Sequence, residues 1–329
     1  MDAERAQEEP INGDCKGNVI ILHFLGARVD FAGEFPRVPV RLLIALSFVS
    51  LAAVSAAEAV ERKIEVVAAE NFYGNVAQQI GGDRVSVVSI LNNPDQDPHL
   101  FEVSPAVIRQ VAAAQVVLYN GAGYDPWVEQ MLSATSKPGR VAIVAADLMH
   151  RKGGDNPHLW YDPATMPSVA RALATALAAA DPAHKDDYAR RLATFIASLG
   201  PLNAKVAAIR DKYAGTTVTA TEPVFGNMAE ALKLTMANER FQLAIMNDTE
   251  PSARDVAAFE RDLNDRKVRV LFYNKQAPTK LVEHLIELAR ASKIPVVGIT
   301  ETAPAGSSYQ DWMLMQLDET ERALAGPSS

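Results

Sequence analysis

The chain has 329 residues, of which 48% are hydrophobic and 22% charged, proportions typical of a folded globular protein rather than a disordered one. Its 40 acidic and 32 basic side chains give a formal net charge of −8, which argues against binding along the phosphate backbone of a nucleic acid. A single cysteine, Cys15, excludes an internal disulfide and metal centres built from several cysteines. Any metal site must therefore use histidine and carboxylate side chains.

An apolar run near the N-terminus has the features of a secretory signal. Residues 42–54 read LLIALSFVSLAAV, with two arginines before them and small residues after them. We expect residues 1–59 to be a leader and signal peptide, and the polar first 36 residues to result from a start codon assigned too far upstream. Because Cys15 precedes the apolar run, it cannot be the acylated cysteine of a lipoprotein. The expected product is a soluble periplasmic protein without a lipid anchor.

Short β-branched runs then alternate with helical stretches. This alternation predicts βα units around a parallel sheet, and we assign residues 60–180 to a first α/β lobe. Its predicted strands are 64–68, 85–91, 116–119 and 141–145. Its predicted helices are 71–80, 105–114 and 126–134.

The pattern changes between residues 163 and 213, where no strand is indicated and apolar residues recur at helical spacing. We predict a helix followed by a longer one. The longer helix, within residues 181–215, would be long enough to run along a whole domain and join two lobes. Gly200-Pro201 is expected to kink or break it.

The βα rhythm returns in residues 216–329, which we assign to a second α/β lobe. Its predicted strands are 217–220, 241–246, 268–273 and 295–300. Its predicted helices are 224–232, 252–265, 279–292 and 309–324. The predicted fold is therefore α/β, with two lobes of mainly parallel sheet joined by a long rigid helix.

Four candidate metal ligands follow predicted strands, at the edge where open parallel sheets bind their ligands. His99 and His158 come from the first lobe, and Glu222 and Glu301 come from the second. Two imidazoles and two carboxylates suit a divalent first-row ion such as zinc, manganese or ferrous iron. However, a lone loop histidine is more often a surface residue, and a glutamate at a strand end usually faces solvent or caps a helix.

The two histidines stand in similar local sequences. Asp97-Pro98-His99-Leu100 and Asn156-Pro157-His158-Leu159 share Pro-His-Leu after a short polar side chain. The proline fixes the backbone, and the Asp or Asn two residues before the histidine can accept the second imidazole N–H, as metal sites require. Glu222 has a similarly stiffened setting, Thr221-Glu222-Pro223. The repeated motif favours metal binding by these histidines, but a surface role is still an alternative.

Other functional signals are weaker. The sequence has no Gly-x-Ser-x-Gly elbow and no Walker lysine motif, so nucleophilic catalysis has little support. His150 is expected to be an exposed loop residue. Trp127, Trp160 and Trp312 are expected to pack between elements rather than to stack a ligand.

Several motifs together resemble the metal-binding class of solute-binding proteins, which supply zinc or manganese to ABC importers. The resemblance covers about residues 64–324 and rests on Asp97-Pro98-His99, Asn120-Gly121-Ala122-Gly123-Tyr124 with Trp127, Asn156-Pro157-His158-Leu159-Trp160 with Asp162-Pro163, Glu250-Pro251-Ser252, and Thr300-Glu301 with Ser308-Tyr309. It implies two lobes joined by a rigid helix. It also implies one ion in the cleft, bound by His99, His158, Glu222 and Glu301 and handed to a membrane permease without any reaction.

The resemblance also concerns the choice of metal. In zinc receptors of the family the third ligand is typically histidine, whereas several manganese receptors have glutamate, so Glu222 favours manganese. The fourth ligand is usually aspartate, and Glu301 departs from that pattern. Many zinc receptors carry a His- and Asp-rich loop between the first two ligands, but here only His150 lies between them. Manganese or zinc is therefore the expected cargo, with ferrous iron a third option.

Two other functions use the same residues. An exported metallohydrolase would need a vacant metal position and a spare carboxylate beside it, for which Glu250 is the nearest candidate, although Glu250-Pro251 is better interpreted as a helix start. A metal-binding surface adhesin would need an anchor, which the position of Cys15 argues against. We expect a monomer that binds no nucleic acid.

Overall fold

The computed structural model describes residues 62–95, 98 and 101–326. Residues 60–329 form one compact unit. The predicted signal segment with Cys15, and the predicted ligand His99, lie outside the described residues.

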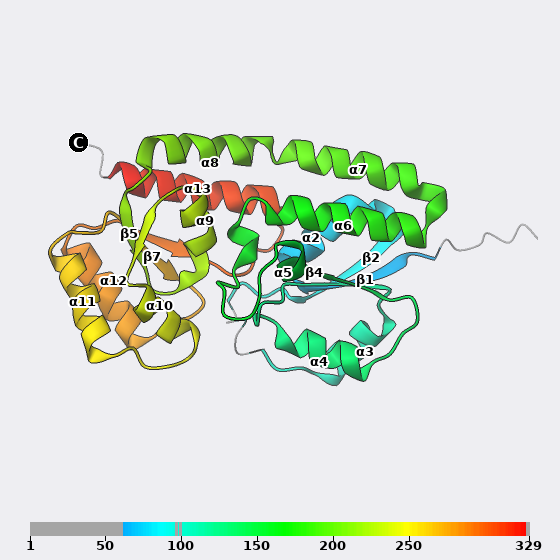
Figure 1. Ribbon diagram of the computed structural model, residues 1–329, viewed down its shortest axis with the longest axis horizontal. Helices are drawn as coiled ribbons and strands as arrows, with labels where there is room; N and C mark the ends of the chain where they lie inside the picture. The colour runs from blue at the N-terminus through cyan, green and yellow to red at the C-terminus, as the bar shows by residue number, and fades with distance from the viewer. Residues whose placement is uncertain (1–61, 96–97, 99–100, 327–329) are drawn as a thin grey trace, which may run out of the picture. The chain divides into compact units, whose positions relative to one another are not determined.

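The first sheet contains four parallel strands in the order β2-β1-β3-β4 (Figure 1). The strands are β1 (Ile64–Glu70), β2 (Val85–Leu91), β3 (Val116–Tyr119) and β4 (Val141–Val144). All four predicted strands are confirmed, with shifts of at most two residues at their ends.

Helices cover both faces of this sheet, as expected for parallel strands that are apolar along their length. Alternate residues of β1 belong to different clusters: Val66 packs with Phe72 and Val169, whereas Val67 packs with Val111 and Met131. The elements around the sheet are α2 (Asn71–Gly81), η1 (Gly82–Arg84), α3 (Pro105–Ala113), α4 (Pro126–Ala134), α5 (Ala145–Leu148), η3 (Leu159–Tyr161) and α6 (Thr165–Ala180).

The second sheet repeats this arrangement, with parallel strands in the order β6-β5-β7-β8. The strands are β5 (Thr217–Ala220), β6 (Thr235–Ala237), β7 (Leu271–Asn274) and β8 (Val296–Ile299). The other elements are η5 (Pro223–Phe225), α9 (Gly226–Ala231), α10 (Glu239–Met246), α11 (Ala253–Asn264), α12 (Lys280–Ala291) and α13 (Tyr309–Ala325). The predicted class, two α/β lobes with parallel sheets, is confirmed.

One predicted strand of the second lobe is wrong. Residues 241–246 belong to helix α10, and the strand lies earlier, at β6. Asn238, at a φ of 57°, turns the chain between the two elements. Phe241 then points inward and packs on Phe259 of α11, with a centroid distance of 4.7 Å. The three residues of β6 are too few to display a strand pattern.

A long helical segment connects the lobes. It consists of η4 (Pro182–His184), α7 (Lys185–Ser198) and α8 (Gly200–Tyr213), and Figure 1 shows α7 and α8 end to end. The predicted break at Gly200-Pro201 is confirmed, because one helix ends at Ser198 and the next begins at Gly200. Length and composition alone would allow this segment to cross a membrane. Its residues Phe195 and Ile209, however, are buried in the main core.

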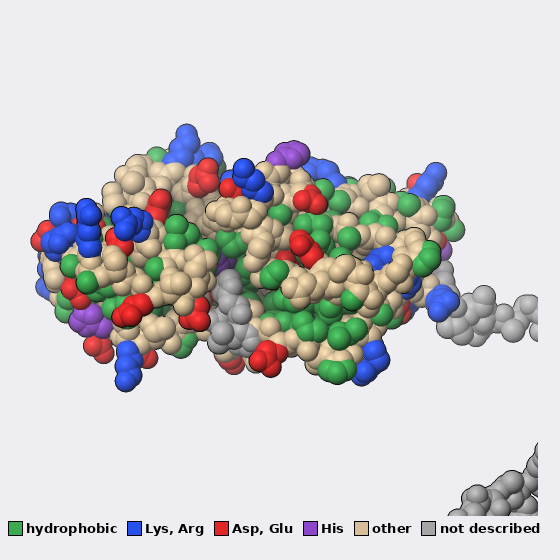
Figure 2. Space-filling view, turned by 60° about the horizontal axis from the view of Figure 1, so that its bottom comes forward, with side chains coloured by type: hydrophobic (Ala, Val, Ile, Leu, Met, Phe, Trp, Pro, Cys, Tyr) green, Lys and Arg blue, Asp and Glu red, His purple; other side chains and the backbone are tan. Residues whose placement is uncertain are grey.

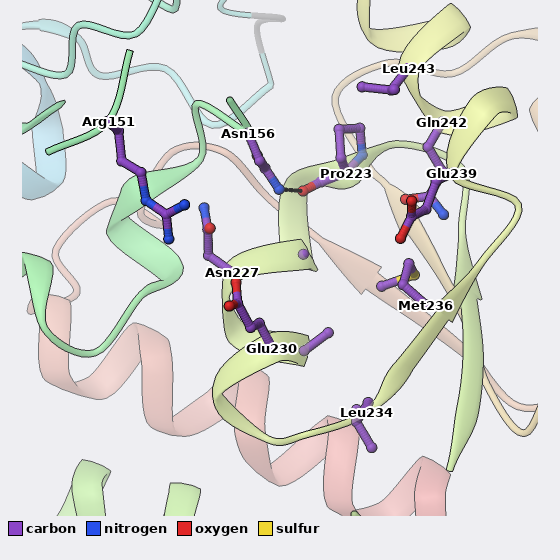
Figure 3. Close-up of a pocket in the computed structure, with 12 residues that line it drawn as sticks. Arg151, Asn156, Pro223, Asn227, Glu230, Leu234, Met236, Glu239, Gln242 and Leu243 are labelled. Carbon is purple, nitrogen blue, oxygen red and sulfur yellow. Dashed lines mark hydrogen bonds between the residues drawn. The ribbon is translucent and has the colours of Figure 1, made fainter. Parts of the chain in front are cut away.

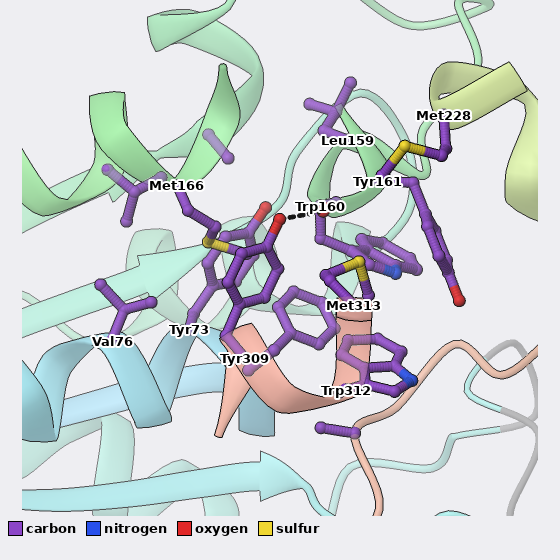
Figure 4. Packing of buried hydrophobic residues seen from close by; sticks show 14 of the residues in the cluster. Tyr73, Val76, Leu159, Trp160, Tyr161, Met166, Met228, Tyr309, Trp312 and Met313 are labelled. Atoms are coloured by element: carbon purple, nitrogen blue, oxygen red, sulfur yellow. Dashed lines mark hydrogen bonds between the residues drawn. The ribbon is translucent and has the colours of Figure 1, made fainter. Parts of the chain in front are cut away.

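The main core contains residues of both lobes, including an aromatic group shown in Figure 4. Trp160 and Trp312 both pack against Phe72, at centroid distances of 4.7 Å and 5.7 Å. The Tyr309 hydroxyl of α13 donates to the Trp160 carbonyl at 2.8 Å. The tryptophans are thus packing residues, as predicted, and α13 begins against the first lobe.

Candidate metal centre

Three of the four predicted ligands are buried near the carboxyl ends of their strands. His158 precedes η3 in the connection after β4 and is fully buried. Glu222 follows β5 by two residues and is 4% exposed, and Glu301 follows β8 by two residues and is fully buried. A surface or solvent-facing role is therefore excluded for these three side chains.

His158 and Glu301 meet across the two lobes. The distance from His158 Nε2 to Glu301 Oε2 is 3.3 Å. The Tyr124 hydroxyl donates to the same Glu301 oxygen at 2.9 Å. Burial and the nearby Glu301 charge raise the pKa of Tyr124 well above its ordinary value, so this hydroxyl remains a donor at neutral pH.

The His158 ring is oriented by Asn156, as its position two residues earlier predicted. Asn156 Nδ2 donates to the Pro223 carbonyl at 2.8 Å, and Asn156 Oδ1 accepts from the His158 backbone N–H at 3.1 Å, which fixes the orientation of the amide. The same oxygen lies 2.8 Å from His158 Nδ1, so Nδ1 carries the proton. This tautomer directs the Nε2 lone pair toward Glu301, as a metal-binding imidazole requires.

Asn274, which sequence analysis did not identify, connects the two predicted carboxylate ligands. Its Nδ2 donates to Glu222 Oε2 at 2.6 Å and to Glu301 Oε1 at 2.7 Å. Asn274 is the last residue of β7, which lies between β5 and β8 in the sheet. The signal in the sequence is a polar residue at the carboxyl end of a central strand, which carries neither charge nor imidazole to mark it as a candidate ligand.

These contacts place three predicted ligands near one another in the interior, but the three do not form a metal-binding cluster by themselves. Within the ranges 62–95 and 101–326, no three His, Cys, Asp or Glu side chains lie close enough together to hold an ion. His158 and Glu301 form a direct pair, and Glu222 is linked to them through Asn274. Because His99 is not described, its position relative to this pair stays a prediction, as does metal ligation by all four residues.

The first lobe contains a second buried acidic pair, Glu70 and Asp125. Asp125 accepts the Asn120 and Gly121 backbone N–H groups at 2.6 Å and 2.7 Å, but burial still raises its pKa to about 6. Burial and the neighbouring Asp125 charge raise the pKa of Glu70 well above its ordinary value. In the described part of the chain, the Glu70 oxygens have no hydrogen-bond partner at ordinary distances. Burial therefore disfavours the charged form of both carboxyl groups.

The other residues considered from sequence lie at the surface or in ion pairs. His150 is exposed, as predicted. His184 and His284 are paired with Asp181 at 2.8 Å and with Glu260 at 3.1 Å. Glu250 is exposed ahead of α11, whose N-cap is Ser252, so this carboxylate is not part of the buried centre.

A cavity of about 420 Å³ lies beside the centre (Figure 3). Arg151 and Asn156 line it from the first lobe, and residues of η5, α9 and α10 line it from the second. Figure 3 shows the Asn156–Pro223 hydrogen bond at its edge. Of the three described candidate ligands, His158, Glu222 and Glu301, none is among its lining residues.

Charges of both signs are mixed on the face shown in Figure 2, where acidic and basic side chains are interspersed over both lobes. Hydrophobic side chains gather on the half of this face that belongs to the first lobe. This face therefore lacks an extended surface of one sign.

Comparison with known proteins decides the family. The family described as zinc-uptake complex component A, periplasmic (ZnuA), matches residues 66–323. The chain belongs to this family. The family match covers both lobes and the connecting helix, so it applies to the whole described fold.

Its relatives are named as metal transport components. The metal ABC transporter substrate-binding lipoprotein SloC of Streptococcus mutans is 23% identical over 302 residues, covering 86% of this chain and 97% of SloC. The manganese ABC transporter substrate-binding lipoprotein PsaA of Streptococcus mitis is 23% identical over 285 residues, covering 80% and 90%. The family thus consists of metal-binding receptors of ABC transporters, as the sequence motifs indicated.

A solved structure supports the fold independently. The periplasmic zinc-binding protein TroA from Treponema pallidum aligns with a TM-score of 0.68 at 20% identity, covering 80% of this chain and 99% of TroA. The two-lobed α/β architecture with a long connecting helix is therefore shared with this protein.

Proposed function

We propose that the mature chain is a receptor that works outside the cytoplasmic membrane. It captures one divalent transition metal, manganese or zinc, between its lobes and delivers it to the permease of an ABC importer. The proposed ligands are His99, His158, Glu222 and Glu301. The observation that carries the proposal is the buried contact between His158 Nε2 and Glu301 Oε2, which pairs an imidazole of one lobe with a carboxylate of the other.

The residues around this contact suit metal capture. Asn156 holds the proton on His158 Nδ1, and Tyr124 holds Glu301 by one oxygen. Burial of the centre removes competing water, which strengthens interactions with an ion. The chain performs no reaction on its cargo in this proposal. It binds the ion when the lobes meet and releases it when they part.

Separation of the lobes would dismantle the centre directly. The bonds from Asn156 to Pro223 and from Asn227 Nδ2 to the His158 carbonyl, both 2.8 Å, join the loops that carry His158 and Glu222. Opening breaks these bonds and withdraws His158 from Glu301 at the same time. A permease that binds both lobes could therefore release the ion by small rotations.

The proposal treats residues 60–180 and 216–329 as the two lobes, residues 181–215 as their connection, and the chain as a monomer. Glu222 favours manganese among the proposed cargoes, because a carboxylate is a harder ligand than the imidazole found there in zinc receptors. The relatives include receptors named for manganese and for zinc, so both ions belong in the test.

The deciding experiment is metal analysis and competition titration of untagged residues 60–329, with Glu301→Ala and Glu222→His as variants. We expect about one ion per wild-type chain, an affinity loss of about 10-fold or more for Glu301→Ala, and a shift toward zinc for Glu222→His. Affinity should fall as the pH drops through about 6.5, where an unperturbed imidazole gains a proton.

Glu250→Ala serves as the matched control, because this carboxylate is exposed and should leave affinity unchanged. A wild-type chain that retains neither ion would overturn the proposed function. Normal affinity in Glu301→Ala would remove that residue from the ligand set.

A further inference from the structure

The segment that carries Glu301 is held by side chains of the first lobe as well as of the second. Asn71, the first residue of helix α2, binds both polar groups of the Ala303 backbone. Its Nδ2 donates to the Ala303 carbonyl at 2.8 Å, and its Oδ1 accepts from the Ala303 N–H at 3.0 Å. One amide of the first lobe therefore fixes the chain just beyond a proposed ligand of the second.

Another contact from the first lobe holds the residue on the other side of Glu301. The Tyr161 hydroxyl donates to the Thr300 carbonyl at 2.8 Å. Tyr161 belongs to η3, which begins directly after His158. Tyr161 is fully buried and Ala303 is 3% exposed, so water competes little for either contact. The backbone on both sides of Glu301 is thus bound to the lobe that carries His158.

We propose that Asn71 and Tyr161 are positioning residues that set metal affinity by holding Glu301 at a fixed distance from His158. This inference rests on the proposed function, in which Glu301 and His158 both bind the ion. Tyr124 contacts the Glu301 carboxylate itself. Asn71 and Tyr161 instead fix the backbone from which that side chain extends, and they are not ligands themselves.

The distance that this arrangement maintains already suits two ligands of one ion. Two atoms bound at about 2.1 Å to a tetrahedral ion lie about 3.4 Å apart. His158 Nε2 and Glu301 Oε2 are 3.3 Å apart, so metal binding requires little movement of either side chain. If the segment 300–303 were loosened, Glu301 could leave this position. The ion would then have to restore the order, which lowers its affinity.

The second lobe also holds this segment, and its bonds are the reason why the effect of Asn71 has to be measured. Gln276 Oε1 accepts from the Glu301 backbone N–H at 2.5 Å. This bond fixes Glu301 within its own lobe. The bonds of Asn71 and Tyr161 fix it relative to His158, which is the relation that an ion bound by both residues needs.

The test measures Zn²⁺ and Mn²⁺ affinity of untagged residues 60–329 as wild type, Asn71→Ala and Tyr161→Phe. Asn71→Ala loses two bonds and should bind both ions about 10-fold more weakly. Tyr161→Phe loses one bond and should bind them about 5-fold more weakly. Phenylalanine keeps the buried ring, so this second variant decides if thermal unfolding shows that Asn71→Ala is not folded.

Asn75→Ala is the matched control. Asn75 lies one turn further along α2 and, like Asn71, is half-buried. Its Oδ1 accepts from the Tyr309 backbone N–H at 3.0 Å, so it also joins α2 to the second lobe, but at the start of α13 rather than beside Glu301. The control should lower the melting temperature of the metal-free chain as Asn71→Ala does, and it should leave both affinities unchanged.

A double variant tests whether Asn71 acts through Glu301. In the Glu301→Ala chain the carboxylate is absent, so its position no longer matters. Adding Asn71→Ala to that chain should therefore weaken binding by less than about 2-fold further.

Three outcomes would overturn this inference: wild-type affinity in either folded variant, an equal loss of affinity in Asn75→Ala, or the full 10-fold loss when Asn71→Ala is added to Glu301→Ala. A wild-type chain that binds neither ion would contradict the proposed function instead, so the two failures are distinguishable.

Discussion

Each lobe buries two acidic side chains at or beyond the carboxyl ends of its strands, but the two pairs are stabilised differently. In the first lobe, Glu70 lies beside Asp125, and burial raises the pKa of both carboxyl groups. In the second lobe, Glu222 and Glu301 share the amide of Asn274. Burial therefore shifts the first pair toward its neutral form, whereas the second pair is held by two hydrogen bonds.

This difference changes how readily each pair carries negative charge. Burial disfavours the charged form of the Glu70 and Asp125 carboxyl groups. An amide donor holds two carboxylates in place and leaves oxygen atoms directed elsewhere. The central strands show the same contrast: the Asn120 side chain, just after β3, bonds to a tyrosine and to backbone carbonyls, whereas Asn274, at the end of β7, bonds to carboxylates.

The largest effect on stability is expected from Asn120→Ala. The Asn120 side chain accepts from the Tyr73 hydroxyl at 2.8 Å and donates to the Pro157 and Gly121 carbonyls at 2.7 Å and 3.0 Å, all in a buried setting. Losing these bonds should lower the free energy of unfolding by about 2–3 kcal/mol. Denaturant unfolding in the presence of a chelator measures this loss.

The matched control is Asn92→Ala, an exposed asparagine of the same lobe, which should change stability by less than about 0.5 kcal/mol. A loss of stability in Asn120→Ala no larger than that in Asn92→Ala would contradict a stabilising role for the buried bonds of Asn120.

A smaller, pH-dependent effect is expected from Glu70→Gln. The folded pKa of Glu70 is raised above its ordinary value of 4.5, so the folded state binds the extra proton. The contribution of Glu70 to the free energy of unfolding of the wild type is fully present below pH 4.5 and declines as the pH rises toward the folded pKa. Above pH 4.5, the free energy of unfolding of the variant should therefore rise relative to that of the wild type, by at most about 1.4 kcal/mol for each pH unit.

Unfolding curves of both proteins between pH 4 and 8 provide the measurement. Glu65→Gln, on the same strand but exposed, should track the wild type throughout. A constant difference between Glu70→Gln and the wild type would mean that the pKa of Glu70 is not raised in the folded state.

The smallest effect is expected away from both acidic pairs, at the contact between α8 and α13. Lys205 Nζ lies 2.6 Å from Asp318 and 2.6 Å from Glu321, and its side chain is 25% exposed. Lys205→Met should cost about 1 kcal/mol or less. The difference from wild type should shrink further at 1 M salt because the charges are screened. A salt-independent loss would point to packing of the lysine stem instead.

The sequence predicts the strand framework well, because parallel buried strands are apolar runs bounded by turns. Only the edge strand of the second lobe was misplaced, since β6 has three residues and the following helix carries apolar residues at 241, 245 and 246. The burial of His158, Glu222 and Glu301 agrees with their predicted place at strand ends.

The connections among these side chains could not be predicted. Tyr124 and Glu301 are 177 positions apart, and Asn274 and Glu222 are 52 apart. Such contacts depend on strand order in space, and an asparagine carries no charge or titratable group that marks it as functional. The orienting role of Asn156 was predictable because it acts over two residues, within local sequence.

Helix α13 packs against the first lobe, and this packing affects when the contacts of that lobe can form. Asn75 Oδ1 accepts the Tyr309 backbone N–H, and Gln79 exchanges side-chain bonds with Gln310, across 231 to 234 positions of sequence. A nascent chain emerging from the ribosome lacks these partners until synthesis is nearly complete. These contacts of the first lobe therefore form only after the last helix of the chain has been made.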